Sequence, residues 1–150
     1  MEPKYNQEDL IDHHGVSAII KDDKGKILMQ EHVKYGFWTI PVGKVMQNQD
    51  VKEGLKQEVF EECNIKVLEC KEIFYKLYEY IRNGKNVKVY THLFEITKYS
   101  GEVKNKEPHK HKKQLFMEIK DIMKLPYLSD TSLLYLETIG LKRSSHLVQS

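Results

Sequence analysis

This sequence has few cysteines, no long apolar run and little net charge. Its two cysteines, Cys63 and Cys70, can build neither a disulfide framework nor a four-cysteine metal site. This sparse use of cysteine is typical of a reducing compartment, and we expect a cytoplasmic protein. No apolar run reaches the length of a membrane-spanning helix, and residues 1–13 lack the basic start and apolar core of a secretion signal. The sequence therefore predicts no membrane partner.

The charge balance is close to neutral, with 24 basic and 22 acidic residues, which argues against attraction of nucleic acid over the whole surface. About 40% of the 150 residues are apolar, enough to bury one core. We therefore expect a single domain over residues 1–150, with flexible ends at about residues 1–13 and 143–150.

The sequence predicts several strands, one helix, more strands and a closing helix. The strand-like segments are residues 16–20, 26–30, 38–40, 73–81, 87–96 and 115–119. Asn83-Gly84 predicts a tight turn between the two longest. One helix is predicted after Asp50, which can cap it in a box with Glu53, and it ends near Asn64. A second helix is expected at about residues 131–141. This order predicts an α/β fold with a mixed β-sheet between helices, and a loop over residues 99–113.

The first helix carries an acidic cluster, Glu58, Glu61 and Glu62. At helical spacing these carboxylates lie within an arc of roughly 100°. Carboxylates on one face repel each other unless a cation offsets their charge, and Mg²⁺ or Mn²⁺ prefers oxygen ligands. The alternative is a solvated acidic patch without a ligand.

The residues around the acidic cluster favour a metal site over a solvated patch. Residues 43–65 read G-KVMQN-Q-DVKEGLK-Q-E-V-F-E-E-C-N-I. This segment resembles the Nudix box, G-x5-E-x7-R-E-U-x-E-E-x-G-U, where U is a bulky aliphatic residue. Gly43 takes the leading position, and the three glutamates follow in register. The order of strands and helices also resembles the Nudix α/β/α sandwich.

The resemblance implies metal-dependent hydrolysis of a phosphoanhydride bond in a nucleoside diphosphate linked to another moiety. It implies that Gly43, Glu58, Glu61 and Glu62 bind Mg²⁺, with Mn²⁺ as an alternative. One of these glutamates, or Glu107 on a later loop, would act as the general base.

Two lysines are candidate phosphate contacts. Lys44 follows the leading glycine of the box, and Lys110 belongs to a lysine-rich segment over residues 104–113. Solvated surface lysines are the alternative for both. For Glu107, in the same segment, the alternative to a catalytic role is a solvated loop residue.

Four positions depart from the Nudix pattern. Gln49 and Gln57 replace the usual Glu and Arg, and we expect their amides to hydrogen-bond to each other in place of an ion pair. Asn64 replaces the last glycine and tolerates the same backbone conformation. Val42 replaces a frequent glycine, which affects the expected shape of the loop at residues 42–46.

Other notable residues have plainer interpretations. Trp38 and Cys63 are expected to be packing residues, and the pair His13 and His14 is expected to be mobile. A zinc site at His109 and His111 has weak support without further ligands. Aromatic residues of the long hairpin are expected mostly in the core or in cross-strand pairs: Phe74, Tyr75, Tyr78, Tyr80 and Tyr90.

The predicted partner is a small nucleotide-type substrate. The alternative is a catalytically weak or inactive Nudix-fold module that binds nucleotides or RNA ends, motivated by the four departures and the lysine-rich loop. An RNA end is possible but not favoured. The chain is expected to be a monomer or a homodimer.

Overall fold

Two β-sheets form the centre of the computed structural model, which describes residues 5–147. The first sheet has the order β4-β1-β6-β5, and the second has the order β3-β2-β7. β1 runs parallel to β6 and antiparallel to β4, so the first sheet is mixed. The strands are β1 (His13–Ile19), β2 (Ile27–His32), β3 (Trp38–Thr39), β4 (Val42–Met46), β5 (Lys66–Arg82), β6 (Lys85–Ser100) and β7 (His111–Met117).

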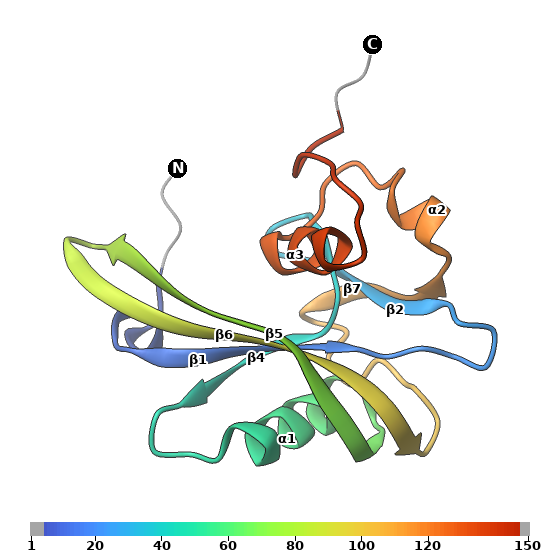
Figure 1. The fold of residues 1–150 in the computed structure, drawn as a ribbon, viewed down its shortest axis with the longest axis horizontal. Helices are drawn as coiled ribbons and strands as arrows, with labels where there is room; N and C mark the ends of the chain where they lie inside the picture. The colour runs from blue at the N-terminus through green and yellow to red at the C-terminus, as the bar shows by residue number, and fades with distance from the viewer. Residues whose placement is uncertain (1–4, 148–150) are drawn as a thin grey trace.

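The helices lie on opposite sides of this centre. α1 packs under the first sheet, whereas α2 and α3 lie on the other side, near the second sheet (Figure 1). The helices are η1 (Gln7–Leu10), α1 (Val51–Cys63), α2 (Ile119–Ile122) and α3 (Asp130–Thr138). The predicted α/β/α arrangement is confirmed, and the strands divide between two sheets.

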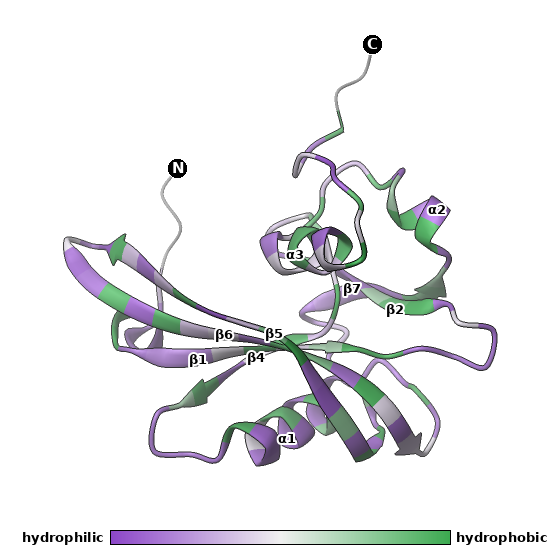
Figure 2. Cartoon of the chain, viewed as in Figure 1, coloured by the Kyte–Doolittle hydropathy of each residue, from purple (hydrophilic) through white to green (hydrophobic). Residues whose placement is uncertain are grey.

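Two apolar cores lie on opposite faces of the first sheet, because successive side chains along β1 point to opposite faces. Val16 and Ala18 point toward α1 and join a core with Leu55 and Val59. Ile19 points the other way and joins a second core below α3. Figure 2 shows hydrophilic and hydrophobic residues alternating along α1, as expected for a helix with one buried face.

α1 has the predicted ends. The carboxylate of Asp50 accepts a hydrogen bond of 3.0 Å from the backbone N–H of Glu53, although the reciprocal half of the predicted capping box is not formed. At the other end Asn64 takes the left-handed conformation, with φ of 67°. Its side chain donates to the carbonyl of Glu102, a bond that glycine could not make.

The long hairpin β5–β6 turns at the predicted residues. Asn83 and Gly84 both have positive φ, 50° and 75°, as a two-residue type I′ turn requires. Its strands are longer than predicted, because pairing continues on both sides of the apolar segments that the sequence marks.

Three expectations about irregular segments are wrong. Residues 42–46 form strand β4 and not a loop, because they pair with β1. The predicted loop over residues 99–113 shrinks to residues 101–110, since β6 and β7 extend into it. Residues 7–13, expected within a flexible end, form η1 and the start of β1.

The chain end is also packed up to residue 147. The guanidinium of Arg143 donates to the carbonyls of Met123 and Leu125, and the backbone N–H of Leu128 donates to the carbonyl of Ser145. The rest of both predicted flexible ends, residues 1–4 and 148–150, lies outside the described residues. Within residues 5–147, no helix is long and apolar enough to cross a lipid bilayer.

Candidate active site

A polar cavity of about 560 Å³ opens where α1, β4 and the loop before β7 meet. It brings together all seven site residues predicted from the sequence: Gly43, Lys44, Glu58, Glu61, Glu62, Glu107 and Lys110. The other lining residues are Asn6, Glu8, Asp9, His13, His32, Val42, Arg82 and His111. The glutamates predicted on α1 and the predicted loop residues therefore share one space.

Glu58 reaches this cavity across the backbone of β4. A Cβ built on Gly43 would lie 2.5 Å from Glu58 Cγ and 2.6 Å from its Oε2, so any other residue would displace the carboxylate from this position. Burial, and then the charge of Glu61, raise the pKa of Glu58 to about 7.

Glu62 is the most buried carboxylate of the cluster, with 4% of its surface exposed. Burial, and then the charge of Glu58, raise its pKa to about 8. One of its oxygens, Oε2, is buried without a hydrogen-bond partner. A buried oxygen without a partner costs free energy and is available to a ligand.

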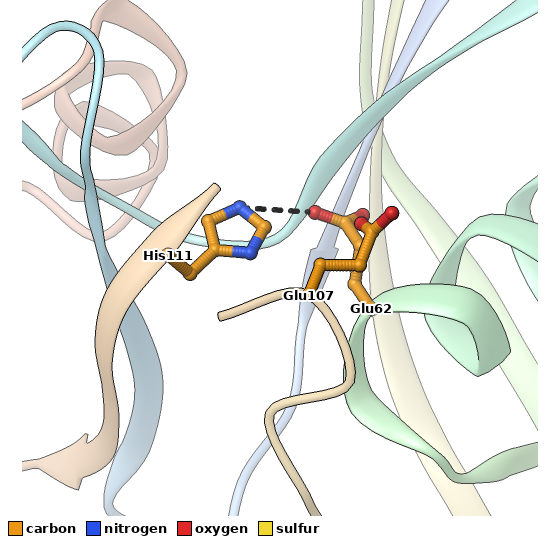
Figure 3. A group of neighbouring side chains, drawn as sticks. All are labelled: Glu62, Glu107 and His111. Carbon is orange, nitrogen blue, oxygen red and sulfur yellow. Dashed lines mark ion pairs between the residues drawn. The ribbon is translucent and has the colours of Figure 1, made fainter. Parts of the chain in front are cut away.

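Glu107 and His111 face Glu62 from the opposite wall (Figure 3). Ligand atoms of these three residues all lie within 4.8 Å of one another. The Nε2 of His111 lies 3.5 Å from Glu62 Oε1. Burial lowers the pKa of His111 to about 4, so this contact joins two neutral groups at neutral pH and is not an ion pair.

The two glutamines of the box do not pair with each other as expected. Gln49 Oε1 accepts a hydrogen bond of 2.9 Å from the backbone N–H of Met46 and closes the turn after β4. Gln57 Nε2 donates a bond of 3.0 Å to Glu61 Oε1, one helical turn away. Gln57 therefore orients Glu61 at the mouth of the cavity.

Both predicted lysines line the cavity and have acidic neighbours. Lys44 Nζ lies 2.7 Å from Asp9 of η1, and Lys110 Nζ lies 3.4 Å from Glu107. Arg82 adds a third cation from the tip of the hairpin, where its guanidinium donates to the carbonyl of Asp9. The cavity thus places cations around the carboxylates, as an anionic substrate requires.

The loop that carries Glu107 is fastened to the end of α1. The backbone N–H of Lys104 donates to the carbonyl of Cys63, and that of Lys106 donates to the carbonyl of Glu62. These bonds hold the loop and the helix at a fixed separation.

The histidine pair at positions 13 and 14 is not mobile. His13 is buried at the start of β1 and lines the cavity. His14 Nδ1 lies 2.9 Å from His92 Nε2 on the α1 side of the sheet, and His92 Nδ1 contacts Glu72. Both histidines are therefore held in the sheet.

The packing interpretations of Trp38 and Cys63 are confirmed. Trp38 is 8% exposed in the core below α3, and Cys63 is fully buried. Burial raises the pKa of the Cys63 thiol, which excludes a thiolate nucleophile at neutral pH. Among the hairpin aromatics, Phe74 packs against the second core, whereas Tyr75 and Tyr80 are largely exposed.

Sequence reasoning missed several residues of the cavity wall. The sequence marks His111 only as half of a weak zinc pair and does not mark Asp9 or Arg82. No local pattern marks them, because they reach the cavity only through the pairing of β7 with β2 and the folding of the hairpin and η1 over β4.

Comparison with known protein families matches residues 12–135 to the NUDIX domain. The chain belongs to the Nudix family. The resemblance read from the box is thereby confirmed, and with it a Nudix-type pyrophosphohydrolase that acts on phosphorus-containing anhydrides.

Relatives of this Nudix hydrolase include a protein named 8-oxo-dGTP diphosphatase from Buchnera aphidicola subsp. Schizaphis graminum. It is 32% identical over 99 residues, which cover 65% of this chain and 72% of the relative. Among solved structures, the MutT NUDIX hydrolase from Burkholderia pseudomallei is 24% identical with a TM-score of 0.67, covering 85% of this chain and 98% of the other. The E. coli ORF135 protein is 21% identical with a TM-score of 0.65, covering 90% and 93%. At these identities the structures show a shared fold.

Proposed function

We propose that this Nudix hydrolase uses a divalent metal ion to hydrolyse a phosphoanhydride bond in a nucleoside diphosphate linked to another moiety, nucleoside triphosphates included. The observation that carries the proposal is the buried carboxylate of Glu62, which has an unpartnered oxygen and lies in one cavity with Glu58. Buried carboxylates this close together are costly unless a cation neutralises them. Hard divalent cations fit such a set of oxygen donors.

In this proposal Glu58, Glu61, Glu62 and the carbonyl of Gly43 hold Mg²⁺, or Mn²⁺ in its place. When bound, the ion neutralises phosphate charge and lowers the pKa of a coordinated water. Gln57 supports the proposal by orienting Glu61.

The remaining groups bind substrate or move protons. Lys44 and Lys110 contact the phosphates, and Glu107 supplies a further oxygen donor from the loop. Glu58 also accepts the proton of the attacking water, in addition to holding the ion.

The name of the Buchnera relative supports including oxidised nucleoside triphosphates among the substrates to be tested. The test is a panel of nucleoside triphosphates, oxidised nucleotides, sugar nucleotides and dinucleoside polyphosphates. Each compound is incubated with Mg²⁺ or Mn²⁺, and released phosphate or pyrophosphate is measured. Glu61→Gln and Glu62→Gln should each lower turnover by at least ~100-fold.

Glu53→Gln is the matched control, because Glu53 lies on the same helix but is exposed and outside the cavity. Melting temperatures establish that each variant folds. Ligand binding by calorimetry without any turnover would favour the inactive binding module. Preference for capped or triphosphorylated RNA over free nucleotides would favour the RNA-end substrate.

A further inference from the structure

His111 is a wall residue of the cavity that the Nudix box does not specify. It begins β7 and is 3% exposed. Its Nε2 lies 3.5 Å from Glu62 Oε1 and 3.3 Å from the side-chain nitrogen of Gln30. Nε2 carries either a hydrogen or a lone pair, and only a lone pair can bind a metal ion.

A chain of hydrogen bonds decides between the two. The carbonyl of Glu62 can only accept, so the Gln114 atom that lies 3.2 Å from it is the amide nitrogen. That nitrogen also donates to the side chain of Gln30 at 2.8 Å, which therefore presents its oxygen there. The amide nitrogen of Gln30 must then face His111 Nε2, and it donates to that atom. His111 consequently carries its lone pair on Nε2, where it accepts from Gln30, and the same amide nitrogen lies 3.4 Å from Glu62 Oε1.

The other polar atom of each of these two side chains, Glu62 and His111, has no partner in the described part of the chain. Within residues 5–147, Glu62 Oε2 and His111 Nδ1 are both buried without a hydrogen-bond partner. The third member of the group, Glu107, closes it from the loop, with all three ligand atoms within 4.8 Å of one another. Two carboxylates and a neutral imidazole together match the charge of a divalent cation.

The spacing also suits coordination. Two ligands about 2.1 Å from one ion in a tetrahedral arrangement lie roughly 3.4 Å apart. Glu62 Oε1 and His111 Nε2 are 3.5 Å apart before any ion is considered. Little movement of either side chain is needed, but the amide of Gln30, which donates to both atoms, must give way to the ion.

We infer that His111, with Glu62 and Glu107, ligates a metal ion, and that this nitrogen ligand makes the enzyme favour first-row transition metals such as Mn²⁺, Co²⁺ or Zn²⁺ over Mg²⁺. The inference rests on the proposed metal-dependent function and specifies its ion. Mg²⁺ prefers oxygen ligands, whereas imidazole nitrogen strengthens binding of transition metals along their affinity series. A site built from glutamates alone would lack this preference.

Mn²⁺ bound to the metal-free full chain tests the inference through its electron spin echo, which detects a directly coordinated ¹⁴N nucleus. The wild-type protein should show nitrogen modulation, and His111→Gln should lose it. His111→Gln should also bind Co²⁺, followed by its visible absorption, at least ~10-fold more weakly. Its affinity for Mg²⁺ should change less than about twofold, since Mg²⁺ gains little from nitrogen.

His109→Gln is the matched control, because His109 is an exposed neighbour outside the cavity. It should retain the nitrogen modulation and the Co²⁺ affinity. A wild-type echo without nitrogen modulation overturns the inference, and this measurement needs no variant to fold. Hydrolysis with Mg²⁺ by that same protein would leave the proposed function intact. Nitrogen coordination without hydrolysis of any compound would instead contradict the proposed function alone.

Discussion

Glu58 lies so close to the backbone of Gly43 that a Cβ at position 43 would come within 2.5 Å of Glu58 Cγ. The contact joins β4 to α1 at the cavity. It also explains why the leading glycine of the box is required even though its φ is not in the left-handed region.

Gly43→Ala should therefore displace the Glu58 carboxylate and lower kcat by about 100-fold, the effect expected when a catalytic group moves by about 1 Å. Steady-state kinetics and the melting temperature measure the two consequences separately. Gly15→Ala on the adjacent strand is the control, because its Cβ would meet Val89 at 3.3 Å, a contact that a small shift relieves. Equal activity of Gly43→Ala and wild type would contradict this account of Glu58.

The stability of the metal-free protein should fall as the pH rises from 6.5 to 8. Glu62 and Glu58 have pKa values raised to about 8 and about 7, so the folded state holds protons that the unfolded state releases near 4.5. Their stabilising contribution is complete below pH 4.5 and is lost as the pH rises through 7 and 8. His111 has a lowered pKa and acts in the opposite direction, but only between about 4 and 6.5.

Urea unfolding with a chelator present should show a loss of about 1–2 kcal/mol between pH 6.5 and 8, and Glu62→Gln should remove most of it. The exposed control Glu53→Gln should retain the wild-type slope. Stability of the wild type that is constant over this window would show that Glu62 titrates normally.

Lys44 and Asp9 should influence KM in opposite directions. Their ion pair of 2.7 Å lies on the wall of the cavity in which the proposed substrate phosphates would bind. Lys44→Gln removes attraction and should raise KM severalfold, whereas Asp9→Asn removes repulsion and frees Lys44, and should lower KM. Kinetics at low and high salt check the electrostatic origin, since the difference should shrink with added salt. Changes of KM in the same direction would contradict it.

Gly54 should be irreplaceable in α1 despite the low helix propensity of glycine. Its Cβ would lie 2.5 Å and 2.7 Å from the two methyl carbons of Val45 on β4. Gly54→Ala should therefore destabilise the protein by about 1–3 kcal/mol. Combining it with Val45→Ala should cost less than the sum of the single changes, because the second substitution makes room for the first. Additive losses would show that the two sites are independent.

Helix α1 was the most predictable part of the molecule. Asp50 and Asn64 mark its ends by local chemistry, and the glutamates between them keep their spacing wherever the helix packs. The turn at Asn83-Gly84 was predictable for the same reason, since both residues tolerate positive φ. These features depend on neighbours in sequence.

The rest of the site depends on residues far apart in the chain. His111 reaches Glu62 because β7 pairs with β2, and Asp9 reaches Lys44 because η1 lies beside β4. The expected pairing of Gln49 with Gln57 failed because nearer partners, Met46 and Glu61, satisfied each amide first. Spacing along a helix cannot reveal such competition.

Backbone hydrogen bonds fix the Glu107 loop to the end of α1. The site is therefore assembled when the protein folds and not anew in each catalytic cycle. A loop that closed only on substrate would lose conformational entropy at every turnover. Here that entropy is lost once, when the protein folds. Changes in the exposed hairpin or in η1 would thus leave in place the walls that hold the carboxylates.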